Sequence, residues 1–127
     1  MKIIEGNLLD INKGVIIHQV NNRGVMGAGI AKQIRAKYPK HYDDYMKNKQ
    51  YEKLGDLVYT RIRRDFVVIG MISQDGYGRD KDKVYTSYDA FEQCLMKINK
   101  LYRKNSNVKY YVPFGIGCNL ANGDWGI

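Results

Sequence analysis

The chain has 127 residues, with 21 Lys and Arg against 13 Asp and Glu, and a formal net charge of +8. This length predicts one domain, residues 1–127, and an apolar share of 44% excludes a disordered chain. No apolar run reaches the roughly 20 residues that span a bilayer, and residues 1–6 lack the apolar stretch of a secretory signal. We therefore expect a cytoplasmic protein, or one of the host cytoplasm if the chain is viral, without a membrane partner.

Two cysteines, Cys94 and Cys118, are too few for a disulfide framework or a four-ligand zinc site, so both thiols are predicted to be free. The basic residues are spread along the chain, and their densest group is Arg61, Arg63 and Arg64. No block of like charge is typical of a nucleic-acid-binding arm. The excess charge predicts a solvated surface that steers anionic ligands, and we do not expect nucleic acid as a partner.

Apolar runs and helical periodicity alternate along the chain. Residues 14–20 form a short apolar run that predicts a buried strand. Ile30, Ile34 and Tyr38 share one helix face within residues 27–38, and Pro39 is expected to end that helix. The remaining predicted elements are a helical piece over 41–49, strands over 57–60 and 66–72 joined by a charged turn, a helix over 87–103, and a strand over 108–113.

The helix over 87–103 has the clearest pattern, because its apolar residues recur at spacings of three and four. Thr86 or Ser87 can cap its start, and Cys94 lies near its apolar face, so packing explains this cysteine better than chemistry does. Strands that alternate with helices predict an α/β domain with a parallel or mixed sheet. In such sheets ligands bind beyond the carboxyl ends of the strands.

Two glycine-bearing loops follow predicted strands. The first, residues 24–31, opens a helix, whose N-terminus offers unpaired N–H groups to an anion. The second, residues 113–120, could present another nest of N–H groups. The pair favours a pyrophosphate site, although glycines in single loops often serve plain turns. The Walker and dinucleotide-binding patterns are absent, which argues against a nucleoside triphosphatase or a Rossmann dehydrogenase.

In order along the chain, residues 6–8, 18–22, 24–31, 74, 77–78, 86–88, 114–120 and 124–125 resemble the motifs of a macro domain. The subgroup they resemble is the bacteriophage and yeast type of ADP-ribose-1''-phosphate phosphatase. The resemblance implies a three-layer α-β-α fold with a mixed central sheet. Since the chain stops at Ile127, soon after Trp125, we expect the family's last helix and strand to be missing, and a partner chain or self-association could complete them.

The resemblance also implies roles for individual residues. Leu8 and Leu9 would lie against the adenine, and the Asn21 amide would hydrogen-bond the distal ribose diol. The first loop would wrap one phosphate and the distal ribose, and the second loop would cradle the other phosphate. The residues concerned are Gly27, Ala28, Gly29 and Ile30 in the first loop, and Gly115, Ile116, Gly117, Cys118, Asn119 and Leu120 in the second.

His18 and Asn21 are the candidate catalytic residues. His18 has the residue type whose pKa suits acid/base work at neutral pH. A histidine in an apolar strand is, however, more often a hydrogen-bonded core residue, and Asn21 could merely close a turn. Both alternatives stay open.

The sequence departs from the family pattern at positions that concern adenine recognition and the reaction mechanism. Asn7 and Gly14 stand where the family usually has Asp, one of which commonly contacts the adenine amino group. Ser73, Gln74 and Ala121 stand where the glycohydrolase branch has its lysine and aspartate, which disfavours a covalent lysine mechanism.

The sequence thus predicts an enzyme that binds ADP-ribose and hydrolyses ADP-ribose 1''-phosphate without a metal or cofactor. The alternatives are a binding module for ADP-ribose or a related nucleotide, and a hydrolase that removes ADP-ribose from protein or nucleic acid.

Overall fold

A mixed four-stranded sheet forms the centre of the molecule. The computed structural model describes residues 7–27, 29–76, 85–105 and 107–113. The strands lie in the order β2-β3-β1-β4. Strand β1 pairs in parallel with β3 and β4, whereas β2 pairs with β3 in antiparallel fashion. Their bounds are Gly14–Asn21 for β1, Leu57–Arg63 for β2, Phe66–Gln74 for β3 and Tyr110–Tyr111 for β4.

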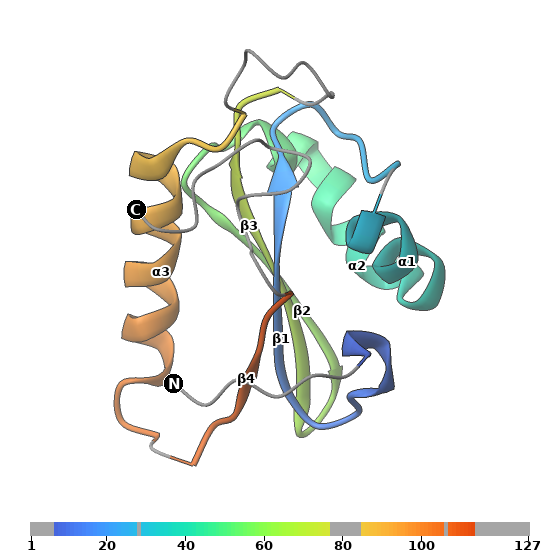
Figure 1. Cartoon of the computed structure of the whole chain (residues 1–127), viewed down its shortest axis with the longest axis vertical. Coiled ribbons are helices and arrows are strands. Elements are labelled where there is room, and N and C mark those ends of the chain that lie inside the picture. Colours follow the sequence, from blue (N-terminus) through green and yellow to red (C-terminus); the bar gives the residue numbers. More distant parts are fainter. Residues whose placement is uncertain (1–6, 28, 77–84, 106, 114–127) are drawn as a thin grey trace.

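Helices cover both faces of this sheet (Figure 1). Helices α1 (Gly29–Lys37) and α2 (Pro39–Met46) lie on one face, and α3 (Tyr88–Tyr102) lies on the other. Short 3-10 helices precede β1 and follow α2, at Leu8–Asp10 (η1) and Lys47–Glu52 (η2). The predicted three-layer α-β-α architecture with a mixed sheet is confirmed.

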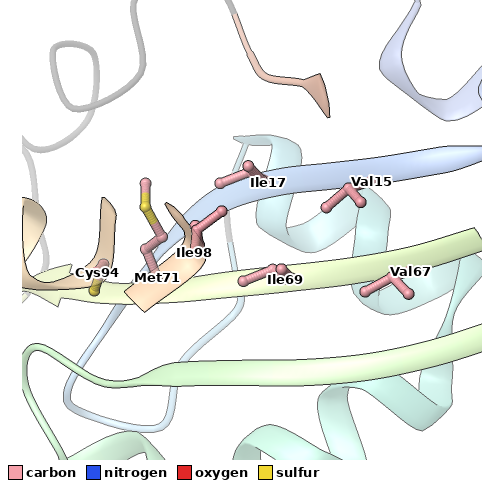
Figure 2. Close-up of a cluster of buried hydrophobic side chains, with 7 residues drawn as sticks. All are labelled: Val15, Ile17, Val67, Ile69, Met71, Cys94 and Ile98. Atoms are coloured by element: carbon pink, nitrogen blue, oxygen red, sulfur yellow. The ribbon is translucent and has the colours of Figure 1, made fainter. Parts of the chain in front are cut away.

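Strands β1 and β3 are buried on both faces, which explains why they appear in the sequence as continuous apolar runs. Alternate side chains point to opposite layers. Figure 2 shows the cluster beneath α3, in which strand residues meet Cys94 and Ile98 of the helix. Cys94 is fully buried there, so the packing interpretation is confirmed. On the other face, Ile34 of α1 and Tyr45 of α2 belong to two further clusters.

The element boundaries differ from the expectations in places with physical causes. Pro39 does not simply end a helix but occupies the first turn of α2, where its missing N–H costs nothing. Tyr38 has φ −126° and therefore separates α1 from α2. The strand expected over 108–113 is reduced to Tyr110–Tyr111. Ser87 caps α3 as predicted, because its hydroxyl accepts from the Ala90 N–H at 3.3 Å.

Several predictions lie outside the described residues. These are Ala28, Cys118, the whole second loop from Gly115 to Leu120, and the expectation of a missing last helix and strand. No helix in the described part of the chain is both long and apolar enough to cross a bilayer.

Candidate functional site at the strand ends

The carboxyl ends of β1 and β3 lie side by side, since these strands are parallel. Asn21 is the partner of Gln74, after a register shift between Val20 and Asn21. The chain then leaves β1 through residues 22–27 and enters α1 at Gly29. Figure 1 shows this edge at the top of the view, where the β1 arrow ends. We call it the strand-end surface: residues 21–27, 74–76 and the first turn of α1.

The Asn21 side chain organises the first loop. Its amide nitrogen donates to the Val25 carbonyl at 2.7 Å, and its oxygen accepts from the N–H groups of Arg23 and Val25. The Tyr45 hydroxyl lies 2.7 Å from the Asn21 carbonyl oxygen and 2.8 Å from the same side-chain oxygen, and it donates its proton to this pair. Asn21 is only 6% exposed. Its amide therefore closes the turn, which is one of the alternatives left open by the sequence.

Tyrosines from the helical layer support this loop from below. Tyr45 is fully buried, and burial raises the pKa of its hydroxyl, which therefore stays protonated and donates to Asn21. The Tyr51 ring lies against Gly24, whose φ of +81° favours glycine. The sequence analysis did not predict a role for either tyrosine. The only signal was that both follow Pro39 within a segment of helical pattern, which could turn one face toward the core.

Asn22 joins the two strand ends and was also missed. Its amide nitrogen donates to the Asp75 carboxylate at 3.1 Å, and its oxygen accepts from the Gly76 N–H at 2.9 Å. Nearby, the Gln19 amide donates to the Thr86 hydroxyl at 3.2 Å. These contacts fix residues 74–76 relative to loop 21–27, so the surface is largely formed before any ligand arrives.

The first turn of α1 opens at this surface. Gly29 has φ +58°, so a side chain there would strain the backbone. Among the described residues that are not its chain neighbours, a Cβ at Gly27 would come within 4 Å of the Val25 side chain alone, at 3.3 Å. Ile30 is half-buried and packs on the cluster beneath α1. The N–H groups of a first helical turn lack intrahelical acceptors and favour an anion.

Leu8 and Leu9 lie away from the strand-end surface. Both pack against the Ile16 cluster, and the Lys37 amine donates to the Leu9 carbonyl. Asn7 caps η1, with its side-chain oxygen accepting from the Leu9 N–H at 2.9 Å. Gly14 has φ +98°, and a Cβ there would lie 2.8 Å from the Lys109 carbonyl oxygen. The family's aspartate therefore does not fit at Gly14.

His18 lies in the core and not at the strand-end surface. It is 0% exposed, and its Nε2 lies 2.8 Å from Nε2 of His41, which is also fully buried. Gly70 of β3 makes room for both rings, because a Cβ there would lie 3.3 Å from His41 Nε2. The location matches the alternative of a hydrogen-bonded core histidine, and no described contact joins His18 to Asn21.

The hydrogen bonds assign one proton to each imidazole ring. The Thr60 hydroxyl donates to the Asp44 carboxylate at 2.7 Å, so it accepts from Nδ1–H of His41, 2.8 Å away. The bare Nε2 of His41 then accepts from Nε2–H of His18. Nδ1 of His18 is left without a partner among the described residues.

Burial controls the charge of this pair. Burial lowers the pKa of His41 to about 4, although the Asp44 carboxylate partly opposes the shift. Burial, and then the neighbouring His41, lower the pKa of His18 well below its ordinary value. Both imidazoles are therefore neutral at pH 7. Elsewhere in the described residues, no group of three His, Cys, Asp or Glu side chains is placed to hold a metal ion.

Solved structures resemble this chain over nearly its whole length. A Bacteroides thetaiotaomicron protein of unknown function is 29% identical, with a TM-score of 0.81 over 97% of this chain and 82% of that one. The macrodomain of Mycobacterium tuberculosis DarG is 23% identical, with a TM-score of 0.75 over 96% of this chain and 80% of that one. The chain has the macrodomain fold.

Two further proteins resemble this chain. Thermosipho africanus DarTG, solved in complex with ADP-ribose, is 18% identical, with a TM-score of 0.74 over 97% of this chain and 35% of that one. A DNA ADP-ribosyl glycohydrolase of Thermus aquaticus is 36% identical over 47 residues, which are 37% of this chain. The matched residues span 13% of that curated relative's length. No family model matches the chain.

Proposed function

We propose that this macrodomain binds ADP-ribose at the strand-end surface. The observation that carries the proposal is the preformed loop 21–27, held by Asn21 and Tyr45 directly before the N-terminus of α1. A solved structure of the same fold contains ADP-ribose, which supports this ligand class. If Asn21 and the glycines serve only to close a turn, the protein will have no affinity for ADP-ribose.

Each part of the surface suits one part of the ligand. The first turn of α1 and the open space at Gly27 suit a phosphate, because N–H groups and the helix dipole favour negative charge there. Asn21 can exchange its contact with the Val25 carbonyl for a ribose hydroxyl, since an amide both donates and accepts. The second loop, from Gly115 to Leu120, would hold the other phosphate. Leu8 and Leu9 lie away from this surface, so we assign them no part of the ligand.

Isothermal titration calorimetry with ADP-ribose tests the site through a matched pair of variants. Gly27→Glu places a carboxylate where we propose a phosphate, and Gly27→Gln adds the same bulk without charge. The position tolerates a side chain better than Gly29, whose φ is +58°. We expect Gly27→Glu to abolish binding and Gly27→Gln to retain part of it. Equal affinities for both variants would overturn the phosphate placement.

A second candidate function is hydrolysis at the distal ribose, favoured by the stretch that is 36% identical to a DNA ADP-ribosyl glycohydrolase. Removal of ADP-ribose from DNA or protein is one form of this reaction. Phosphate release from ADP-ribose 1''-phosphate, without a metal, is the other. His18 reaches neither substrate from its buried position without a rearrangement, so a positioned water or the substrate's own groups would have to supply the acid/base chemistry.

A panel of three substrates separates these forms: ADP-ribose 1''-phosphate, an ADP-ribosylated oligonucleotide and an ADP-ribosylated protein. Each is assayed with and without a chelator. If His18 is the acid/base, His18→Ala should lower the rate by roughly 100-fold while binding survives. If the variant turns over at the wild-type rate, His18 is a core residue. Binding without turnover of any substrate would leave the protein an ADP-ribose-binding module.

A further inference from the structure

The opposite end of the sheet carries a groove of about 710 Å³. It lies where β1 begins and where β2 turns into β3, at the bottom of the view in Figure 1. Its lining includes Lys13, Lys37 and Arg63, together with the carboxylates of Asp10 and Asp65. The fold thus gathers here basic residues that are far apart in the sequence.

Further cations adjoin the groove. Arg61 donates to the Arg64 carbonyl at 3.0 Å within the β2–β3 turn, and Lys40 of α2 donates to the Arg61 carbonyl at 3.3 Å. Arg63 donates to the Asn12 carbonyl at 2.7 Å, which joins the turn to the segment before β1. We call this set the basic end; its members are Lys13, Lys37, Lys40, Arg61, Arg63 and Arg64, and all are exposed.

The charge of the basic end is largely uncompensated. In the described parts of the chain, ion pairs form between Arg23 and Asp75 and between Lys97 and Asp56, and both lie elsewhere. The hydrogen bonds of Lys40, Arg61 and Arg63 go to carbonyl oxygens, which fix the side chains without neutralising them. The groove lining itself contains three cations and the two carboxylates of Asp10 and Asp65, and Lys40, Arg61 and Arg64 beside it add to the positive charge.

We propose that the basic end binds the phosphate backbone of a nucleic acid, at a site separate from the strand-end surface. Arginine forks match phosphate oxygens in geometry, and a phosphodiester chain supplies a negative charge at every nucleotide. The exposed large apolar residues, such as Met96 and Leu101 of α3, do not line the groove. A lipid surface would therefore gain little by insertion here. Base stacking has no exposed aromatic platform in the groove, so binding is independent of sequence.

Fluorescence anisotropy with a labelled single strand of about 20 thymidines, at about 50 mM salt, tests this proposal. The variant Lys13→Glu/Arg64→Glu reverses two charges for which the structure gives no side-chain hydrogen bond. Its control, Lys100→Glu/Lys104→Glu, makes the same change in net charge at exposed positions in the last turn of α3 and just after it. We expect at least about a fivefold loss of affinity for the first and less than a twofold loss for the control. The salt dependence of log K should become shallower by about 1.4 for the first variant.

Three results would overturn the proposal: equal losses for the two variants, no binding at low salt, or displacement of the oligonucleotide by polyglutamate as readily as by unlabelled DNA. Calorimetry with ADP-ribose on the same variants separates the two sites. The basic-end variant should bind ADP-ribose like the wild type, whatever its affinity for DNA. If ADP-ribose displaces the oligonucleotide, the nucleic acid binds at the strand-end surface and not at the basic end.

Discussion

The two faces of the sheet are built from alternate residues of the same strands, yet they differ in chemistry. The cluster beneath α3 consists of apolar side chains and the Cys94 thiol (Figure 2). The face beneath α1 and α2 has a chain of polar groups, from Asp44 through Thr60 and His41 to His18, between two apolar clusters. Packing alone stabilises the first face, whereas protonation also controls the second.

The largest effect should come from the apolar face. Ile69 is fully buried under α3, so Ile69→Ala should lower the free energy of unfolding by about 2–5 kcal/mol. Urea denaturation measures the loss, which should be the same at pH 7.5 and pH 5.5. Met96→Ala, at a residue of α3 that is 64% exposed, is the control and should change little. A loss at Ile69 no larger than that of the control would contradict the assignment of this core.

Acid should lower the free energy of unfolding, because it protonates the histidines that are buried beneath α1 and α2 once the chain unfolds. The pKa of His41 falls from 6.5 to about 4 in the folded protein, so the unfolded chain binds more protons between these values. Stability is therefore full above pH 6.5 and declines as pH falls toward 4, by on the order of 3 kcal/mol from His41. His18, whose pKa is also lowered, adds to the loss in the same direction.

Urea melts across this pH range test the acid effect, with His41→Leu as the comparison. The variant should show a shallower decline, because one buried imidazole no longer titrates. A decline of unchanged steepness would mean that other groups govern acid stability.

A smaller loss of stability should follow when the series of hydrogen bonds from Asp44 to His18 is interrupted at Thr60. Thr60→Val removes the acceptor of the His41 N–H and the donor to Asp44, which should cost about 1–3 kcal/mol. Thr60→Ser keeps the hydroxyl and should restore most of the stability at pH 7.5. If valine is tolerated as well as serine, the hydrogen bonds of Thr60 contribute nothing measurable.

The smallest effect on stability should come from the hydrogen bond by which the Ser87 side chain caps α3. Ser87→Ala removes the side-chain acceptor of the Ala90 N–H and should destabilise the protein by about 1 kcal/mol. Ser87→Asp should remain near wild type, because a carboxylate also caps the helix and favours its dipole. A thermal melt of the three proteins measures the difference. Equal melting temperatures for alanine and aspartate would exclude a role for the cap.

Sequence periodicity predicted the strands and helices well, because β1, β3 and α3 each bury a repeating set of apolar residues. It could not predict the His18–His41 contact, since the two residues are 23 positions apart and only the fold brings them together. Gly70, in the middle of an apolar strand, was the available signal, because a glycine there indicates a close approach. The basic end was predicted only in part for the same reason. The sequence showed the group at residues 61–64, but only the fold brings Lys13, Lys37 and Lys40 to it from other segments.

At the strand-end surface, the sequence predicted Asn21 and the glycines but not the partners that fix them. Tyr45 and Asn22 bond to residues far away in the sequence, and no local spacing predicts such contacts. Gly14 shows the converse, because a departure from the family pattern proves to follow from local geometry, namely a carbonyl oxygen where a Cβ would lie.

The hydrogen bond from Tyr45 should also slow the opening of the first loop. Loops usually open within microseconds, so their amide protons exchange quickly with solvent. The Arg23 and Val25 N–H groups instead donate to an Asn21 oxygen that a core tyrosine holds. In deuterium exchange these two amides should remain protected about as long as those of β1, and Tyr45→Phe should release them while leaving β1 protected.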